Sequence, residues 1–236
     1  MIPKILHYCW FGRNPKPKIV CKCMESWKKY LPDYEIREWN EDNFDIHICP
    51  YVEQAYAAKK WAYVSDYCRF YVLNKYGGVY VDTDVEFVKN IDNLLFSKFM
   101  GFAQNDIINS GLIMATTAND WFCQELLNSY VGNNFVFDNP NKVLAIGKRG
   151  TSIFVKHGLQ LNGLEQKVED YIIYPSYMFN PTQGDAHYKL DGRAYSIHHY
   201  AATWFPKGAR MRNRIRQLIG SKNLRLYNKI KKFFSL

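Results

Sequence analysis

Residues 65–87, SDYCRFYVLNKYGGVYVDTDVEF, contain the pattern on which the expected fold depends. Residues 55–76 are predicted to form a helix, because apolar side chains recur at helical spacing in its second half. These positions are Val64, Tyr67, Cys68, Tyr71 and Val72. Gly77 and Gly78 are expected to end the helix, since glycine readily adopts the left-handed conformation found at helix C-termini. The chain is therefore predicted to turn sharply here into its next element.

That next element is the apolar run 79–81, VYV, which predicts a short buried strand ending at Asp82 and Asp84. Two carboxylates at this position point into the crevice where open α/β sheets bind ligands. Carboxylates suit hard cations such as Mn²⁺ or Mg²⁺. An Asp-x-Asp sequence also occurs in solvated turns, but such turns rarely follow a glycine pair and an apolar strand so closely. We therefore expect a divalent metal here, and such a metal could neutralise the negative charge of a leaving group such as a diphosphate.

Strands and helices alternate on both sides of this stretch. Before it, the patterns predict a buried strand, a helix and an alternating strand at residues 2–12, 18–30 and 34–39. After it, they predict strands at 99–103, 111–115, 170–175 and 194–200, with a helix at 121–131. This alternation is typical of a sheet flanked by helices. It predicts one α/β domain over residues 1–206.

The composition is that of a globular protein, with 236 residues of which 47% are hydrophobic. Aromatic residues reach 17%, and although most are expected in the core, tyrosine also suits carbohydrate and nucleobase faces. The chain shows no apolar run of about 18 residues and no secretory leader, which predicts a cytoplasmic protein. The six cysteines lack metal-ligand spacing and are expected to be reduced thiols, and a zinc site at Cys21 and Cys23 is the less favoured alternative.

The net charge of +9 comes from the C-terminal end of the chain. Residues 207–236 hold ten of the 31 Lys and Arg and no Asp or Glu, so residues 1–206 carry 21 basic and 22 acidic residues. Nucleic-acid binding by this near-neutral body has no electrostatic support. In the tail, basic and apolar residues interleave, which predicts a basic amphipathic helical segment at an anionic membrane surface. A helix packed on the domain, with its charged side in solvent, is the alternative.

Ser65, Asp66 and Arg69 are predicted to share one face of the helix that leads to the Asp-x-Asp sequence, because they are three and four residues apart. As a surface ion pair they would contribute only a few tenths of a kcal/mol. As part of a site, Asp66 would accept hydrogen bonds from sugar hydroxyls, and the planar fork of Arg69 would bind phosphate or sugar.

His198 and His199 lie on the predicted strand 194–200. Neighbouring residues on a strand face opposite sides of the sheet, so only one of the two is expected to face the crevice. A neutral imidazole is a suitable third ligand for Mn²⁺. A histidine in the core or on the surface is the alternative.

The run SDYCRFYVLNKYGGVYVDTDVEF resembles the sugar-binding region of family 32 glycosyltransferases, which include bacterial capsular-polysaccharide enzymes and fungal mannosyltransferases. It is more distantly similar to the glucosylating domains of large clostridial toxins. The segments IPKILHYCWFG, YEIREWNEDNFD, NSGLIMA, IIYPSYMFNP and SIHHYAATW match the same family pattern, in the same order. The resemblance extends over residues 2–204. It implies a GT-A fold, with a Rossmann-like mixed sheet, a nucleotide-sugar donor and a divalent cation.

Carried over by position, the resemblance implies a role for each matching residue. It assigns the nucleoside to Tyr8, Trp10, Asn40 and Ser65. It assigns the donor sugar to Asp66 and Arg69, the ribose and the waters of the metal to Asp82, and the metal itself to Asp84. His198 matches the histidine of the family near the diphosphate, with His199 as second choice, and Trp204 matches its Ser-Trp ending. Thr203 stands in place of that serine and keeps the hydroxyl.

The resemblance also implies retention of the anomeric configuration, for which the sequence names no nucleophile. Asp66 and Asp106 are candidates for a double displacement. We favour front-face attack through an oxocarbenium-like state, in which the departing phosphate accepts the proton of the acceptor.

The expected reaction is transfer of a hexose or N-acetylhexosamine, from a UDP-sugar rather than GDP-mannose, to a glycan or lipid-linked oligosaccharide. Surface polysaccharide synthesis, capsular or lipopolysaccharide, at the inner face of the membrane would suit such an acceptor. Proteins of two other classes are alternatives. A phosphohydrolase of the haloacid-dehalogenase type also has a strand-end Asp-x-Asp, but nearer the N-terminus and followed by Thr or Val where this chain has Glu86. A membrane- or RNA-binding module would use the tail alone.

Overall fold

The first strand, β1 (Ile5–Cys9), is apolar on both faces and is buried in the middle of the molecule. The computed structural model describes residues 1–135, 146–182, 190 and 192–201. Within these ranges β1 pairs in parallel with β2 (Glu35–Trp39) on one side and β3 (Gly78–Tyr80) on the other. Because all three strands point the same way, Trp10 and Asp82 leave the sheet at the same edge.

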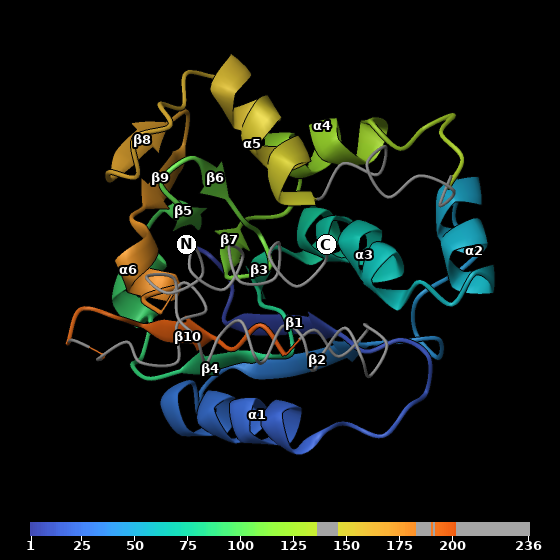
Figure 1. Ribbon diagram of the computed structural model, residues 1–236, viewed down its shortest axis with the longest axis horizontal. Coiled ribbons are helices and arrows are strands. Elements are labelled where there is room, and N and C mark those ends of the chain that lie inside the picture. The colour runs from blue at the N-terminus through green and yellow to red at the C-terminus, as the bar shows by residue number, and fades with distance from the viewer. Residues whose placement is uncertain (136–145, 183–189, 191, 202–236) are drawn as a thin grey trace, which may run out of the picture.

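The main sheet has the strand order β2-β1-β3-β7-β5-β9-β8, with β6 paired to β5 (Figure 1). Its remaining strands are β5 (Lys98–Gln104), β6 (Ile107–Ile108), β7 (Met114–Thr116), β8 (Gln166–Val168) and β9 (Tyr171–Tyr174). Strand β7 runs antiparallel to both β3 and β5, so the sheet is mixed. A separate antiparallel pair joins β4 (Val85–Phe87) to β10 (Ser196–His198).

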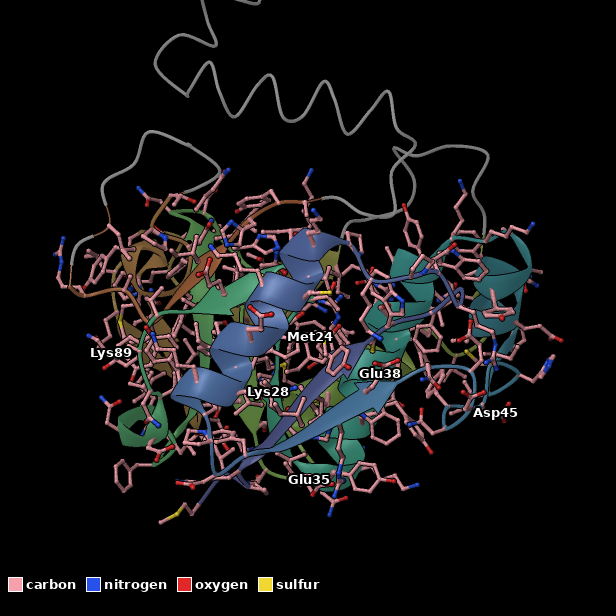
Figure 2. The ribbon with its side chains drawn as sticks, turned by 90° about the horizontal axis from the view of Figure 1, so that it is seen from below. Met24, Lys28, Glu35, Glu38, Asp45 and Lys89 are labelled. Carbon is pink, nitrogen blue, oxygen red and sulfur yellow. The ribbon has the colours of Figure 1, made fainter. Side chains whose placement is uncertain are left out.

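Helices cover both faces of this sheet (Figure 1). They are α1 (Lys18–Tyr30), α2 (Pro50–Ala57), α3 (Trp61–Tyr76), α4 (Trp121–Asn128), α5 (Ile146–Lys156) and α6 (Ser176–Phe179), with a 3₁₀ turn at Asp92–Leu94. Figure 2 shows α1, with Met24 and Lys28, on the side opposite α3. None of the helices in the described ranges is both long and apolar enough to cross a membrane. The predicted α/β architecture of mixed sheet and flanking helices is confirmed.

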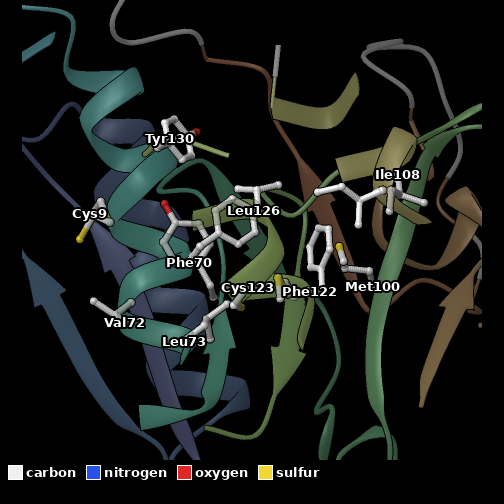
Figure 3. Close-up of a cluster of buried hydrophobic side chains, with 14 of the residues drawn as sticks. Cys9, Phe70, Val72, Leu73, Met100, Ile108, Phe122, Cys123, Leu126 and Tyr130 are labelled. Carbon is white, nitrogen blue, oxygen red and sulfur yellow. The ribbon is translucent and has the colours of Figure 1, made fainter. Parts of the chain in front are cut away.

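Each face of the sheet has its own apolar core. Tyr80 of β3 points toward α3 and α4, where Phe70 and Phe122 meet edge to face with ring centroids 5.6 Å apart (Figure 3). Val79, one residue earlier, packs in the second cluster with Trp27 of α1. This alternation along β3 places the next residue on the Tyr80 side, Asp82, beside α3.

The prediction of a single helix over residues 55–76 was wrong, because the structure has two helices there, the end of α2 and then α3. Lys59 adopts the left-handed conformation, with φ 57°. The N–H of Lys60 donates to the carbonyl of Ala55, which closes α2 with a helix-terminating turn that glycine usually occupies. Because a lysine stands at that position, the sequence carries no signal for the break.

His7 joins β1 to the turn before β3. Its Nδ1 accepts a hydrogen bond from Trp39 Nε1 at 3.0 Å, so its Nε2 carries the proton and donates to the Gly77 carbonyl at 2.8 Å. The side chain is fully buried, and burial lowers its pKa from 6.5 to about 4. His7 is therefore a neutral histidine that holds the glycine turn against β1.

We expect His7 to make the protein lose stability as the pH falls from about 6.5 to about 4. In this pH range His7 becomes protonated in the unfolded chain but stays neutral in the folded one. This difference lowers the free energy of unfolding by about 3 kcal/mol. Unfolding by urea at several pH values should therefore show a steeper loss for the wild type than for His7→Gln. His47→Gln, at an exposed histidine, should keep the steep loss. Equal slopes for wild type and His7→Gln would contradict this role.

Candidate active site

Asp82 and Asp84 follow β3 directly and are held by backbone contacts on both sides. The N–H of Asp82 donates to the carbonyl of Gly111 at 2.8 Å, and the N–H of Val85 donates to the carbonyl of Asp82 at 3.1 Å. Helix α1 anchors the strand that comes next, because Trp27 Nε1 donates to the Val85 carbonyl at 2.7 Å. The two carboxylates therefore stand on a tight turn between two fixed strands.

Asp82, Asp84 and His198 form one cluster, in which one ligand atom from each lies within 4.8 Å of the others. His198 Nε2 lies 3.1 Å from Asp84 Oδ1, and Asp84 Oδ2 accepts the N–H of Ala201 at 2.8 Å. Burial alone would raise the pKa of Asp84, but the charge and hydrogen bond of His198 outweigh it and lower that pKa to about 2. Burial would lower the pKa of His198, and the Asp84 carboxylate raises it above its usual value.

This cluster fits a divalent cation. Two carboxylates and an imidazole form a mixed oxygen and nitrogen donor set of the kind that binds Mn²⁺. His198 is only 7% exposed, and its Nδ1 has no hydrogen-bond partner among the described residues. The ring is therefore bound to the cluster through Nε2 alone.

His199 points away from this cluster. Its Nε2 lies 2.7 Å from Glu86 Oε2, which also pairs with Lys22 of α1 at 2.8 Å. The two histidines therefore face opposite sides, as expected for neighbouring residues of a strand. His198 is the one beside Asp84.

Arg69 links the cluster to Asp66. Its Nη2 lies 2.9 Å from Asp66 Oδ1 and 3.2 Å from Asp82 Oδ1, and its side chain is only 5% exposed. The guanidinium also lies 4.8 Å from the centre of the Tyr80 ring. Burial raises the pKa of Asp66 to about 6, although the positive charge of Arg69 opposes the rise. The alternative of a surface ion pair is therefore wrong, because the guanidinium is enclosed between two carboxylates.

Ser65 lies one residue before Asp66 on the same helix. Its Oγ donates to the carbonyl of Trp61 at 3.1 Å, one turn earlier on α3. The hydroxyl is half-buried, and the carbonyl of Ser65 accepts a hydrogen bond from Arg69 Nε at 3.4 Å.

Glu38 is the centre of a second polar cluster, at the end of β2 (Figure 2). Its carboxylate accepts from Tyr8 Oη at 2.5 Å and from Asn40 Nδ2 at 3.0 Å, and pairs with Lys16 at 2.8 Å. Trp10 is half-buried nearby, with Lys16 Nζ 5.7 Å from its ring centre. Three residues predicted for the nucleoside therefore gather around a carboxylate that the sequence did not single out.

Tyr8 itself is a core residue. Its ring is 3% exposed and packs against Trp27, with centroids 5.1 Å apart. Only its hydroxyl reaches the second cluster, through Glu38. Contact of the Tyr8 ring face with a base stays a prediction, and Trp10 is the more accessible ring.

Gly111 lies against the carboxylate of Asp82. A Cβ at this position would lie 2.1 Å from Asp82 Oδ2 and 3.0 Å from Arg69 Nη1. Ser110, just before it, has its Oγ 3.4 Å from the same Nη1. Neither Ser110 nor Gly111 is among the site residues predicted from the sequence; the available signal is the glycine before a strand in the segment NSGLIMA.

We expect Gly111→Ala to fold but to lose about 10²-fold in activity, because a displacement of about 1 Å at a reacting group has effects of that size. The methyl group would push aside the end of a flexible side chain, the Asp82 carboxylate, rather than backbone. Steady-state rates and thermal unfolding should be measured together. Gly192→Ala is the matched control, because its added Cβ would meet no described atom within 4 Å. Full activity in Gly111→Ala would show that the position of Asp82 does not matter.

Two sequence predictions lie outside the described residues. Trp204, with Thr203 before it, falls in the range 202–236. So does the basic tail, residues 207–236.

Comparison with known proteins finds matches to the part of the chain that contains Asp66, Asp82 and Asp84. Residues 17–100 match the family model of the glycosyltransferase sugar-binding region containing the DXD motif. Over 98 residues, 40% of this chain, the sequence is 32% identical to inositol phosphoceramide mannosyltransferase 3 of Schizosaccharomyces pombe. The matched part is 27% of that protein, so the chain spans about a quarter of the curated relative.

Two solved structures share the fold. The PaToxG glycosyltransferase superposes with a TM-score of 0.52 at 20% identity, covering 66% of this chain and 69% of the other. A glycosyltransferase involved in the glycosylation of the major capsid of PBCV-1 superposes with a TM-score of 0.50 at 13% identity, covering 91% and 100%. These matches confirm the predicted GT-A type of fold. Over residues 17–100 the chain is therefore similar to the glycosyltransferase sugar-binding region, and Asp82 and Asp84 lie in that stretch as an Asp-x-Asp sequence.

Proposed function

We propose that this protein is a metal-dependent glycosyltransferase that retains the anomeric configuration. It would transfer a hexose or N-acetylhexosamine from a UDP-sugar to a glycan or lipid-linked oligosaccharide in surface polysaccharide synthesis. The observation that carries the proposal is the continuous chain of contacts from Asp66 through Arg69 to Asp82, with Asp84 and His198 beside it.

Asp82, Asp84 and His198 would hold the metal and, through it, the diphosphate. A bound divalent cation would neutralise the negative charge that develops on the leaving diphosphate. The imidazole favours Mn²⁺ over Mg²⁺, which prefers an all-oxygen shell. Family membership finer than the DXD region, within family 32 or near the clostridial toxins, stays a prediction.

Asp66 and Arg69 would bind the donor sugar. Arg69 is fixed on both sides by carboxylates, so its remaining N–H groups are already oriented before a ligand arrives. Asp66 Oδ1 faces Arg69, which leaves lone pairs of the carboxylate for sugar hydroxyls. The buried ion pair would therefore orient the sugar over the metal cluster.

The second cluster would bind the nucleoside at the same edge of the sheet. Trp10 would offer its ring to the base, while Asn40 and Ser65 would supply polar contacts. Glu38 holds Asn40 and Lys16 in place and would determine where their donors point.

Front-face attack fits the described carboxylates better than a double displacement. Asp66 is tied to Arg69, and a paired carboxylate is a weakened nucleophile. Asp106 lies exposed in the turn between β5 and β6. The departing phosphate would then accept the proton of the acceptor hydroxyl, and trapping of a glycosyl-enzyme at Asp66 or Asp106 would overturn this step.

A GDP-mannose donor is the second candidate. It is favoured by the partial match to a mannosyltransferase. The membrane surface proposed as a partner of residues 207–236 rests on their sequence alone.

The test is a panel of UDP-, GDP- and CMP-sugars, incubated with the protein in Mn²⁺ or in EDTA, with release of free nucleotide as the measurement. We expect slow hydrolysis of one donor in Mn²⁺ and none in EDTA. Equal release in EDTA would remove the metal from the proposal. No release from any donor, with no thermal stabilisation by a nucleotide and Mn²⁺, would remove the transferase reaction itself.

A further inference from the structure

Within the part of the chain that the structure describes, His198 lacks the usual support of a metal-binding histidine. Such residues generally donate their second ring N–H to a carboxylate or carbonyl, which fixes the orientation of the ring. Nδ1 of His198 is buried and has no hydrogen-bond partner among the described residues. What orients this imidazole within the described ranges is therefore packing rather than a hydrogen bond at Nδ1.

Tyr200 supplies that packing. Its ring meets the imidazole of His198 edge to face, with centroids 4.1 Å apart at 65°. Tyr200 has a positive φ of 49°, unusual for a residue other than glycine. This backbone turn lets Tyr200 contact the residue two positions before it, and it also directs the N–H of Ala201 onto Asp84.

Asn180 fixes the far end of Tyr200. Its Nδ2 donates to Tyr200 Oη at 2.6 Å and to the carbonyl of Ala103 in β5 at 2.9 Å. Asn180 is fully buried, one residue after α6. Both amide hydrogens are thus used, one on the main sheet and one on the tyrosine.

The main chain around Asn180 also aligns β10. The N–H of Tyr195 donates to the carbonyl of Met178 at 2.7 Å, and Ser196 Oγ donates to the carbonyl of Phe179. The end of α6 therefore contacts the His198 segment at its start, through backbone, and at its end, through Asn180.

We propose that Asn180 and Tyr200 are positioning residues for the metal site, forming a brace from β5 to the imidazole of His198. The inference rests on the proposed metal-binding function and extends it to two residues that touch no ligand. Position 180 requires an amide because its two N–H groups donate to the Ala103 carbonyl and to Tyr200 Oη. The apolar leucine and the acceptor aspartate, although similar in size, cannot donate to both oxygen atoms.

The experiment measures Mn²⁺ affinity directly, from the electron paramagnetic resonance signal of free Mn²⁺ during titration. Loss of a residue that supports a metal ligand typically weakens metal binding about 10–100-fold. We expect a weakening in this range for Asn180→Ala and, with the ring retained, a smaller one for Tyr200→Phe. The double variant should be no weaker than Asn180→Ala, because both changes break the same contact.

A rate measurement separates positioning from general damage. With donor present and Mn²⁺ saturating, the brace variants should recover most of the wild-type kcat while keeping a raised KM for Mn²⁺. Asn74→Ala is the matched control, since the amide oxygens of Asn74, on α3, and of Asn180 are both buried with no hydrogen-bond partner among the described residues. It should bind Mn²⁺ as the wild type does.

The outcomes distinguish failure of the Asn180–Tyr200 brace from failure of the metal site itself. Unchanged Mn²⁺ affinity in both Asn180→Ala and Tyr200→Phe would overturn the brace and leave the metal site standing. Equal weakening in Asn74→Ala would also overturn it, because the effect would then be one of stability. Failure of the wild-type protein to bind Mn²⁺ would overturn the proposed function, and the brace with it.

Discussion

Asp84→Asn is expected to lower Mn²⁺-dependent turnover of the donor by about 10³-fold, because metal assistance contributes several kcal/mol and each 1.36 kcal/mol is tenfold in rate. The asparagine keeps the shape and one acceptor oxygen. It removes the negative charge that His198 and Ala201 converge on. Mn²⁺ affinity and kcat/KM should therefore both fall, while the fold is retained.

Glu86→Gln is the matched control for this prediction. Glu86 lies two residues further on and pairs with Lys22 and His199 instead of the cluster. We expect its Mn²⁺ affinity and turnover to stay within twofold or so of the wild type, as for a surface ion pair of about 0–1 kcal/mol. Normal turnover in Asp84→Asn, or an equal loss in Glu86→Gln, would place the metal elsewhere.

Local patterns account for the parts of the fold that the sequence predicted. Helix α3, the glycine turn and β3 follow one another without a gap, and each has its own signal in periodicity, glycine or apolar run. Gly77 does adopt a positive φ of 64°, and its N–H donates to Leu73. The carboxylates at the end of β3 could therefore be placed from twenty or so consecutive residues.

The pairing of strands that are far apart in the sequence could not be predicted from local patterns. Strand alternation says that one of His198 and His199 faces the site, and only the register of β10 on β4, with His198 opposite Val85, says which. The role of Gly111 depends on β7 lying beside β3. Glu38 has no motif of its own, and it contacts Tyr8 because β2 pairs with β1.

The burial of Asp66 and Arg69 could not be predicted from their spacing in the sequence. Positions three apart on a helix predict contact between Asp66 and Arg69 wherever the helix lies. The structure adds that Tyr80 and Ser110 close over the guanidinium. This enclosure changes the expected cost of mutation from tenths of a kcal/mol to several.

Arg69→Met is accordingly expected to lower the free energy of unfolding by about 3–5 kcal/mol near pH 8, as does removal of one partner from other buried ion pairs. The change leaves Asp66 and Asp82 facing each other without a cation. The pKa of Asp66 is already raised to about 6, and loss of the guanidinium would raise it further. Chemical denaturation at several pH values measures the cost.

The sign of the pH dependence follows from that raised pKa. Between this raised pKa and the usual carboxyl pKa of the unfolded chain, Asp66 is protonated in the folded variant and ionised in the unfolded one. Lowering the pH through this range therefore stabilises the variant relative to its state at pH 8. The deficit against wild type should therefore shrink toward pH 5. A deficit that is independent of pH would mean that lost packing, rather than the uncompensated charge of the buried carboxylates, is the cause.

Two further variants separate charge from packing. Asp66→Asn in the Arg69→Met background should recover part of the lost stability, because it removes one of the two uncompensated carboxylates. Arg13→Met, at an exposed arginine paired with Asp42, should cost no more than about 1 kcal/mol. If the double variant were less stable than Arg69→Met, Asp66 would be needed for the fold in its own right. Recovery of stability without recovery of donor turnover would instead show that this ion pair is retained for binding the sugar, at a cost that an uncharged core would avoid.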